Sequence, residues 1–152
     1  MRTVALRDVA VTGSGGTPRR ATSEYFGEGT PWLSIADLND GVVTSAKESL
    51  TKAGIANSSA KVVPAGTLLI AMYGSIGKLG IAGRELCTSQ AIAFVRPDPN
   101  EVDTRYLFHY FLAERPKLLA LGRGGTQMNI SQGDLREWLV PLPPLDEQRR
   151  IA

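Results

Sequence analysis

The chain has 152 residues, of which 43% are hydrophobic and 21% charged, and its formal net charge is +2. These values are typical of one globular domain with a core, and so small a charge is by itself no argument for nucleic acid. No run of about 18 apolar residues is present, and the start is too short and too charged for a signal peptide, so we expect a soluble, cytoplasmic protein. The single Cys87 excludes an internal disulfide and is expected to be a buried thiol.

The first part of the chain has the pattern of short strands joined by loops. Alternating apolar residues at 4–11 predict one or two strands, with a break near Arg7 and Asp8. Residues 13–18 predict a glycine-rich loop, residues 32–35 a further strand, and residues 39–41 a turn.

Two apolar runs further along, residues 67–72 and 91–95, have the length expected of strands buried on both faces. We take the first as the core strand. Residues 74–83 lie between them and contain four glycines, which predict a tight turn, a bulge or a close approach of backbone. These runs favour a mixed sheet.

Helical patterns are weak in the middle of the chain and clear towards its end. Residues 51–57 and 58–62 predict short helical pieces. From Asp103 the apolar residues recur at helical spacing, and Pro116 is expected to kink or divide this helix. Ser131 and Asp134 have the spacing of a capping box. The whole pattern predicts an α+β fold with a twisted, mixed, partly barrel-like β-sheet and peripheral helices.

The last residues predict the start of a helix. Pro143 and Pro144 stop a short apolar run, and Asp146 and Glu147 suit the positive end of a helix dipole. The sequence ends at Ala152, about two turns later, and isolated helices this short are marginal in water. We expect either a frayed tail or the truncated start of a longer helix.

Nucleotide-binding and methyltransferase motifs do not match. A phosphate-binding loop ending at Gly77-Lys78 requires glycine at position 72, which is Met72. The glycines of residues 74–80 also have the wrong spacing for a dinucleotide fingerprint. Pro143-Pro144 lacks the flanking residues of an Asn/Asp-Pro-Pro-aromatic methylation motif.

No catalytic, metal or cofactor site is predicted. One histidine, His109, and one cysteine cannot build a zinc site of the usual kind. Asp98, Glu101 and Asp103 leave a divalent-metal nuclease open as an alternative. A solvated turn and a helix cap explain these carboxylates better, because no lysine lies nearby to complete such a site.

The polar loops do supply residue types that bind DNA. Arginine and lysine contact guanine, asparagine and glutamine contact adenine, and hydroxyls and basic groups hold phosphates. Any one of these residues has a solvated loop position as its alternative, but as a group they predict a DNA-facing edge. The candidate DNA-binding residues are Ser14, Thr17, Arg19, Arg20, Tyr73, Ser75, Lys78, Arg123, Thr126, Gln127 and Asn129.

Several motifs carry a resemblance that covers nearly the whole chain. Residues 141–151, PLPPLDEQRRI, resemble the signature that closes a target-recognition domain in specificity subunits of Type I restriction-modification enzymes. The wider pattern of that family is matched, in order, by Gly16-Thr17-Pro18, Tyr25, Pro31-Trp32, Asp37-Leu38, Ser58-Ser59-Ala60, Ile76-Gly77-Lys78, Gln90 and Gly125-Thr126.

The resemblance implies a non-catalytic function. Such a domain reads one half-site of a bipartite double-stranded DNA target and directs partner methyltransferase subunits and, through them, a restriction subunit. Residues 1–144 would be the recognition domain, and residues 145–152 the truncated start of a spacer and dimerisation helix that pairs with a second recognition domain. The alternative is a structural or protein-interaction domain that keeps this fold without binding DNA.

Overall fold

The computed structural model describes residues 2–122 and 130–152, and in this part of the chain the strands form three sheets. The largest sheet has the order β2 (Ala10–Ser14), β9 (Ile92–Pro97), β6 (Leu68–Ala71), β7 (Leu79–Ala82) and β4 (Gly41–Val43). A three-stranded sheet has the order β5 (Glu48–Leu50), β3 (Phe26–Leu33) and β8 (Cys87–Thr88), and a two-stranded sheet pairs β1 (Arg2–Ala5) with β10 (Leu139–Leu142).

The helices are short apart from the second. The α-helices are α1 (Lys52–Ala56), α2 (Thr104–Ala113), α3 (Arg115–Gly122), α4 (Gln132–Arg136) and α5 (Leu145–Ile151), and the 3-10 helices are η1 (Leu6–Asp8), η2 (Ser23–Tyr25) and η3 (Ile35–Asp37). No described helix is long and apolar enough to cross a membrane.

Strand β6 is the centre of the fold, as its apolar run predicts. All four of its residues are buried, and it pairs antiparallel with β7 on one side and β9 on the other. Because β4 pairs parallel with β7, the large sheet is mixed. The predicted α+β class is confirmed, although the strands are divided among three sheets and none closes into a barrel within the described residues.

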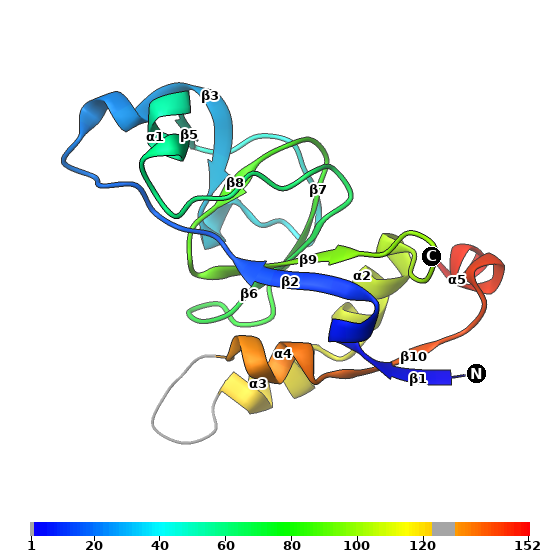
Figure 1. Ribbon diagram of the computed structural model, residues 1–152. Helices are drawn as coiled ribbons and strands as arrows, with labels where there is room; N and C mark the ends of the chain where they lie inside the picture. The colour runs from blue at the N-terminus through cyan, green and yellow to red at the C-terminus, as the bar shows by residue number, and fades with distance from the viewer. Residues whose placement is uncertain (1, 123–129) are drawn as a thin grey trace.

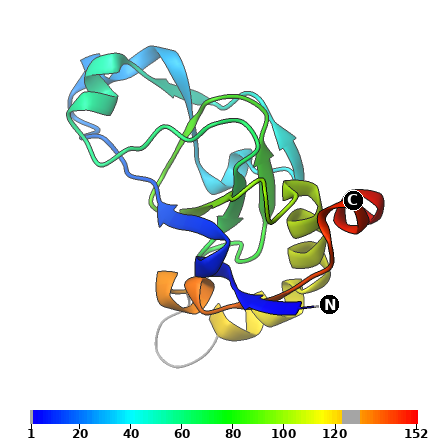
Figure 2. The same ribbon diagram turned by 45° about the vertical axis from the view of Figure 1, so that its right-hand side comes forward.

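The side chains of β6 divide the core into two layers. Successive residues of a strand point to opposite faces of its sheet. Leu68 and Ile70 pack into a cluster with Phe111 of α2 and Leu118 of α3, whereas Leu69 and Ala71 belong to a second cluster that contains Leu33 and Leu86. Figures 1 and 2 show the result, with α2, α3 and α4 on one side of the large sheet and the three-stranded sheet with α1 at the other end of the molecule.

The helices begin and end at the capping residues and the proline that the sequence indicates. Asp103 caps α2 and accepts hydrogen bonds from the backbone N–H groups of Arg105 (3.0 Å) and Tyr106 (3.1 Å). The helix is divided as expected, since α3 begins directly before Pro116. Ser131 and Asp134 form the predicted capping box of α4.

Two local predictions are wrong. Residues 58–62 form no helix, because Ser58 instead donates its hydroxyl to the Gly54 carbonyl (2.7 Å) and so closes the end of α1. The strand expected at residues 32–35 begins earlier, at Phe26, and ends at Leu33. A shift in its register with β5 lets the strand run through two glycines and Pro31, which masked it in the sequence.

Helix α5 is docked on the domain through one side chain. Gln148 is only 1% exposed, and its side-chain oxygen accepts a hydrogen bond from the backbone N–H of Asp103 (2.9 Å). Its amide group donates to the carbonyls of Glu101 (3.0 Å) and Pro143 (2.9 Å). These bonds hold α5 against the turn that precedes α2, so α5 is a packed element of the domain rather than a frayed tail.

Replacing this glutamine tests the docking. Gln148→Ala should lower the free energy of unfolding by about 2 kcal/mol or more, because three backbone groups lose a buried partner. The measurement is urea unfolding followed by tryptophan fluorescence. Arg150→Ala, an exposed change on the same helix, is the control and should stay within about 0.5 kcal/mol of the parent. Equal unfolding midpoints for the two variants would contradict the docking role.

Candidate nucleic-acid interface

The segment between β2 and η2 is held by a close approach of backbone. The Gly16 N–H donates to the Thr88 carbonyl at 3.0 Å. A Cβ on Gly16 would lie 2.0 Å from the Ser59 hydroxyl oxygen and 2.7 Å from the Ser59 carbonyl carbon. No side chain fits in this space, so glycine is required because of the packing and not because of its φ angle.

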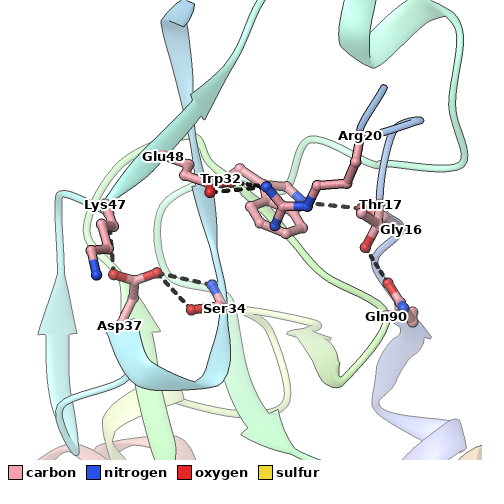
Figure 3. A network of polar contacts seen from close by, with 9 residues as sticks. All are labelled: Gly16, Thr17, Arg20, Trp32, Ser34, Asp37, Lys47, Glu48 and Gln90. Carbon is pink, nitrogen blue, oxygen red and sulfur yellow. Dashed lines mark hydrogen bonds and ion pairs between the residues drawn. The ribbon is translucent and has the colours of Figure 1, made fainter. Parts of the chain in front are cut away.

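Side chains from two other segments hold Gly16 and Thr17. The indole N–H of Trp32 donates to the Gly16 carbonyl at 3.0 Å, and the Thr17 hydroxyl donates to the side-chain oxygen of Gln90 (Figure 3). Gly16, Thr17, Trp32, Ser59 and Gln90 all lie in motifs that carry the resemblance. The fold therefore brings these separate motifs together around one segment.

Arg20 is part of this packing. Its Nη1 lies 2.9 Å from both carboxylate oxygens of Glu48, and Figure 3 shows Arg20 beside Glu48 and Trp32. Its Cζ lies 5.1 Å from the ring centroids of both Phe26 and Trp32. The guanidinium thus has partners within the protein, although 57% of the Arg20 side chain remains exposed. The neighbouring Arg19 is exposed and has no ion-pair partner within the described residues.

Another matched motif, Asp37-Leu38, closes the connection between β3 and β4. One oxygen of the Asp37 carboxylate accepts from the Ser34 backbone N–H at 2.9 Å, and the other accepts from the Lys47 backbone N–H at 3.2 Å (Figure 3). Leu38 is buried in the second core cluster. This motif is therefore structural.

The predicted glycine-rich turn connects β6 to β7. Gly74 and Gly77 have φ values of 70° and 83°, which side chains rarely adopt, so the turn requires glycine at both positions. Tyr73 and Ser75 are exposed, and Lys78 is half-buried. The sequence-predicted residues on this turn thus point at least partly to solvent.

A charged side chain from α3 holds the far end of the turn. The Arg115 Nε donates to the Gly77 carbonyl at 3.0 Å, and its Nη2 lies 2.6 Å from an Asp40 carboxylate oxygen. The same oxygen accepts from the Leu79 backbone N–H at 2.9 Å. The turn is consequently rigid at its base.

Backbone hydrogen bonds join the predicted loops. Met72 donates its N–H to the Ala91 carbonyl at 2.9 Å and accepts from the Ile130 N–H at 2.7 Å. Ala91 follows Gln90, which holds Thr17. The segment at 14–20, the turn at 72–78 and Ile130, which follows segment 123–129, are therefore linked in one series of contacts.

The remaining predicted residues are placed less completely. Ser14 ends β2, and its carbonyl accepts a hydrogen bond from the Lys61 ammonium at 3.3 Å. Lys61 was missed from the sequence although it directly follows the matched motif Ser58-Ser59-Ala60, and Gln90 was noted only as part of a motif. The predicted residues Arg123, Thr126, Gln127 and Asn129 lie outside the described residues.

The carboxylates and the thiol that could act in catalysis make structural contacts instead. Glu101 pairs with Arg2, Asp98 accepts from the Asn100 backbone N–H, and Asp103 caps α2. Burial raises the pKa of Cys87 to about 11, so this thiol is protonated at neutral pH. No group of three possible metal ligands occurs among the described residues.

The chain is similar to known proteins along its whole length. The family described as "Type I restriction modification DNA specificity domain" matches residues 1–152. The specificity subunit of the Type I restriction enzyme MjaIX from Methanocaldococcus jannaschii is 26% identical over 97% of this chain and 35% of its own length.

Two solved structures share the fold. A chain from a type I R-M system, solved in a study of complex assembly and conformational transition, has a TM-score of 0.80 and 28% identity over 99% of this chain and 36% of its own. The HsdS subunit from Thermoanaerobacter tengcongensis has a TM-score of 0.77 and 26% identity over 99% of this chain and 35% of its own. The chain thus spans about a third of the length of these relatives. It belongs to the family of Type I restriction modification DNA specificity domains, whose members are specificity components and not catalytic ones.

Proposed function

We propose that this chain is a target-recognition domain that binds double-stranded DNA and reads one half of a bipartite sequence. Family membership over residues 1–152 supports a recognition function. The observation that carries the proposal is the series of hydrogen bonds through Met72, Ala91 and Gln90. These bonds link segment 14–20, the turn at 72–78 and Ile130, which supports a single DNA-facing edge formed by the polar segments.

The proposed roles divide between phosphate and base contacts. Arg19, Lys61 and Lys78 are accessible cations beside the joined segments and would hold phosphates, which fixes the register of the domain on the duplex. Ser14, Thr17, Tyr73 and Ser75 would add polar contacts. Arg20 would act mainly by positioning its segment, because Glu48 and two aromatic rings already engage its charge.

Bases would be read from the segment at 123–129, where the sequence supplies Arg123, Thr126, Gln127 and Asn129. Glutamine and asparagine pair with adenine in the major groove, and arginine pairs with guanine. No catalytic step is assigned to this chain. An enzyme that methylates a base must first flip it out of the base stack. A partner subunit would carry out both the flipping and the methylation.

Partners would join at the end of the chain. We propose that residues 1–144 are the recognition domain and that residues 145–152 begin a spacer helix. Such a helix would pair with a second recognition domain and carry methyltransferase subunits and, through them, a restriction subunit. The docking of Gln148 supports this division, because it gives the start of the helix a fixed position on the domain.

The experiment that tests recognition is selection from a random duplex library at low salt with the purified chain. It is repeated with a form extended through the complete helix and co-purified with methyltransferase. Enrichment of a short motif, stronger in the extended complex, is the expected result, since one domain with few phosphate contacts binds weakly. If the complex forms and enriches nothing, the chain is a protein-interaction domain that keeps this fold without reading DNA.

The phosphate role of Lys78 has a specific signature. Lys78→Ala should weaken binding to all duplexes alike and reduce the slope of log K against log salt by about 1, because one counterion fewer is released. Anisotropy titrations over a range of salt concentrations measure both effects. Arg84→Ala is the control, because Arg84 follows β7 at the opposite end of the β6–β7 hairpin. A change in sequence preference with an unchanged salt slope would argue against a phosphate contact.

Base reading has a different signature. Gln127→Ala or Asn129→Ala should change which bases are enriched, at a cost of about 1 to 3 kcal/mol for each lost bidentate contact, and should leave the salt slope nearly unchanged. The measurement is the library selection repeated with each variant. Asn100→Ala removes the same kind of side chain from an exposed turn before α2 and should enrich the parental motif. If all three variants enrich the same motif as the parent, Gln127 and Asn129 do not read the bases.

A further inference from the structure

A cationic cleft lies at the opposite end of the β6–β7 hairpin from the proposed DNA edge. Its volume is about 520 Å³. It is lined by the turn before β6, the end of β9, the start of α2 and one side of α5. In Figure 1 these elements lie near the C-terminus, away from the 72–78 turn.

Three arginines line this cleft, and each comes from a different element: Arg96 from β9, Arg105 from α2 and Arg149 from α5. None of them forms an ion pair within the described residues, and the same holds for Arg19, Arg84, Arg136 and Arg150, whereas Arg2, Arg7, Arg20 and Arg115 each pair with a carboxylate. The cleft therefore brings together three guanidinium groups that have no ion-pair partner among the described residues.

The one carboxylate in the lining already accepts hydrogen bonds from the backbone. Asp103 is the single carboxylate that lines the cleft, and its Oδ1 accepts two backbone N–H groups at the start of α2. The positive end of α2, a helix of ten residues, adds to the field of the arginines. The net charge of the lining favours an anion.

The walls of the cleft are fixed rather than mobile. Gln148, next to Arg149, is buried and makes three hydrogen bonds to the turn before α2 and to Pro143. The Thr104 hydroxyl donates to the Gly66 carbonyl at 2.7 Å, which ties α2 to the opposite wall. A site whose walls are held in this way loses little conformational freedom when it binds.

We propose that this cleft binds an acidic segment of a partner protein, in which a glutamate or aspartate side chain lies between apolar ones. The arginines would receive the carboxylate through bidentate hydrogen bonds. Ile81, Val102 and Leu145 also line the cleft and would contact the apolar neighbours of that side chain. A nucleic acid fits less well, because a sugar–phosphate backbone offers nothing to these apolar residues.

The test uses the whole chain and a defined probe. The probe is a fluorescent, end-capped hexapeptide of alternating leucine and glutamate, and the comparison peptide has glutamine in place of glutamate. Anisotropy at low salt should give about tenfold tighter binding for the glutamate peptide, the difference expected for one charged hydrogen-bonded contact. Equal binding of the two peptides overturns the proposal.

Matched variants locate the site. The double variant Arg105→Gln/Arg149→Gln should lose the preference for glutamate. Arg136→Gln/Arg150→Gln removes the same charge from exposed positions outside the cleft lining and should keep the preference. If both double variants lose it equally, the peptide responds only to net charge and the cleft is not its site.

Three further readouts separate this proposal from DNA recognition. Side-chain N–H signals of Arg96, Arg105 and Arg149 should shift on adding the glutamate peptide, and a duplex oligonucleotide should not displace it. Displacement by the duplex would assign the cleft to nucleic acid and overturn the proposal. The cleft variant should also enrich the same DNA motif as the parent, so failure of one proposal does not imply failure of the other.

Discussion

Burial of β6 on both faces is the constraint on which the rest of the domain depends. Four consecutive apolar residues cannot face water, so the chain must cover them from two sides, with α2 and α3 on one and the segments around Leu33 and Leu86 on the other. The hairpin that β6 forms with β7 then has two ends with different surroundings. Polar segments meet at its turn, and arginines gather at its open end. The two proposed interfaces are therefore separated by the same strand that forms the core.

The sequence predicts most of this core because local rules and tertiary packing agree there. The apolar runs of β6 and β9, the Asp103 cap and the capping box at Ser131 each have a signal within a few residues. The three-stranded sheet was largely missed. β5 and β8 are too short for a periodic pattern, and β3 contains Gly27, Gly29 and Pro31, so its pairing depends on partners distant in the sequence.

The candidate interface was predictable in composition but not in geometry. Glycines and polar residues mark the loops, yet nothing local shows that Ser59 and Thr88 enclose Gly16, or that Arg20 stacks on Trp32. A charged loop residue looks the same in a sequence whether or not it pairs with a carboxylate. Only the fold separates Arg20, which is paired with Glu48, from Arg19, for which the described residues offer no such partner.

The docking of α5 has a mechanical consequence. A helix rises 1.5 Å per residue, so a small rotation at its first turn moves any further turn by an amount that grows with distance, as in a lever. Gln148 lies within that first stretch of helix and is fixed by three backbone groups, two of them in the turn that leads into α2. The stiffness of this one joint would limit how far anything carried on a continuation of α5 could swing relative to the sheet. A buried amide side chain would thereby set the angle of any such continuation relative to the sheet.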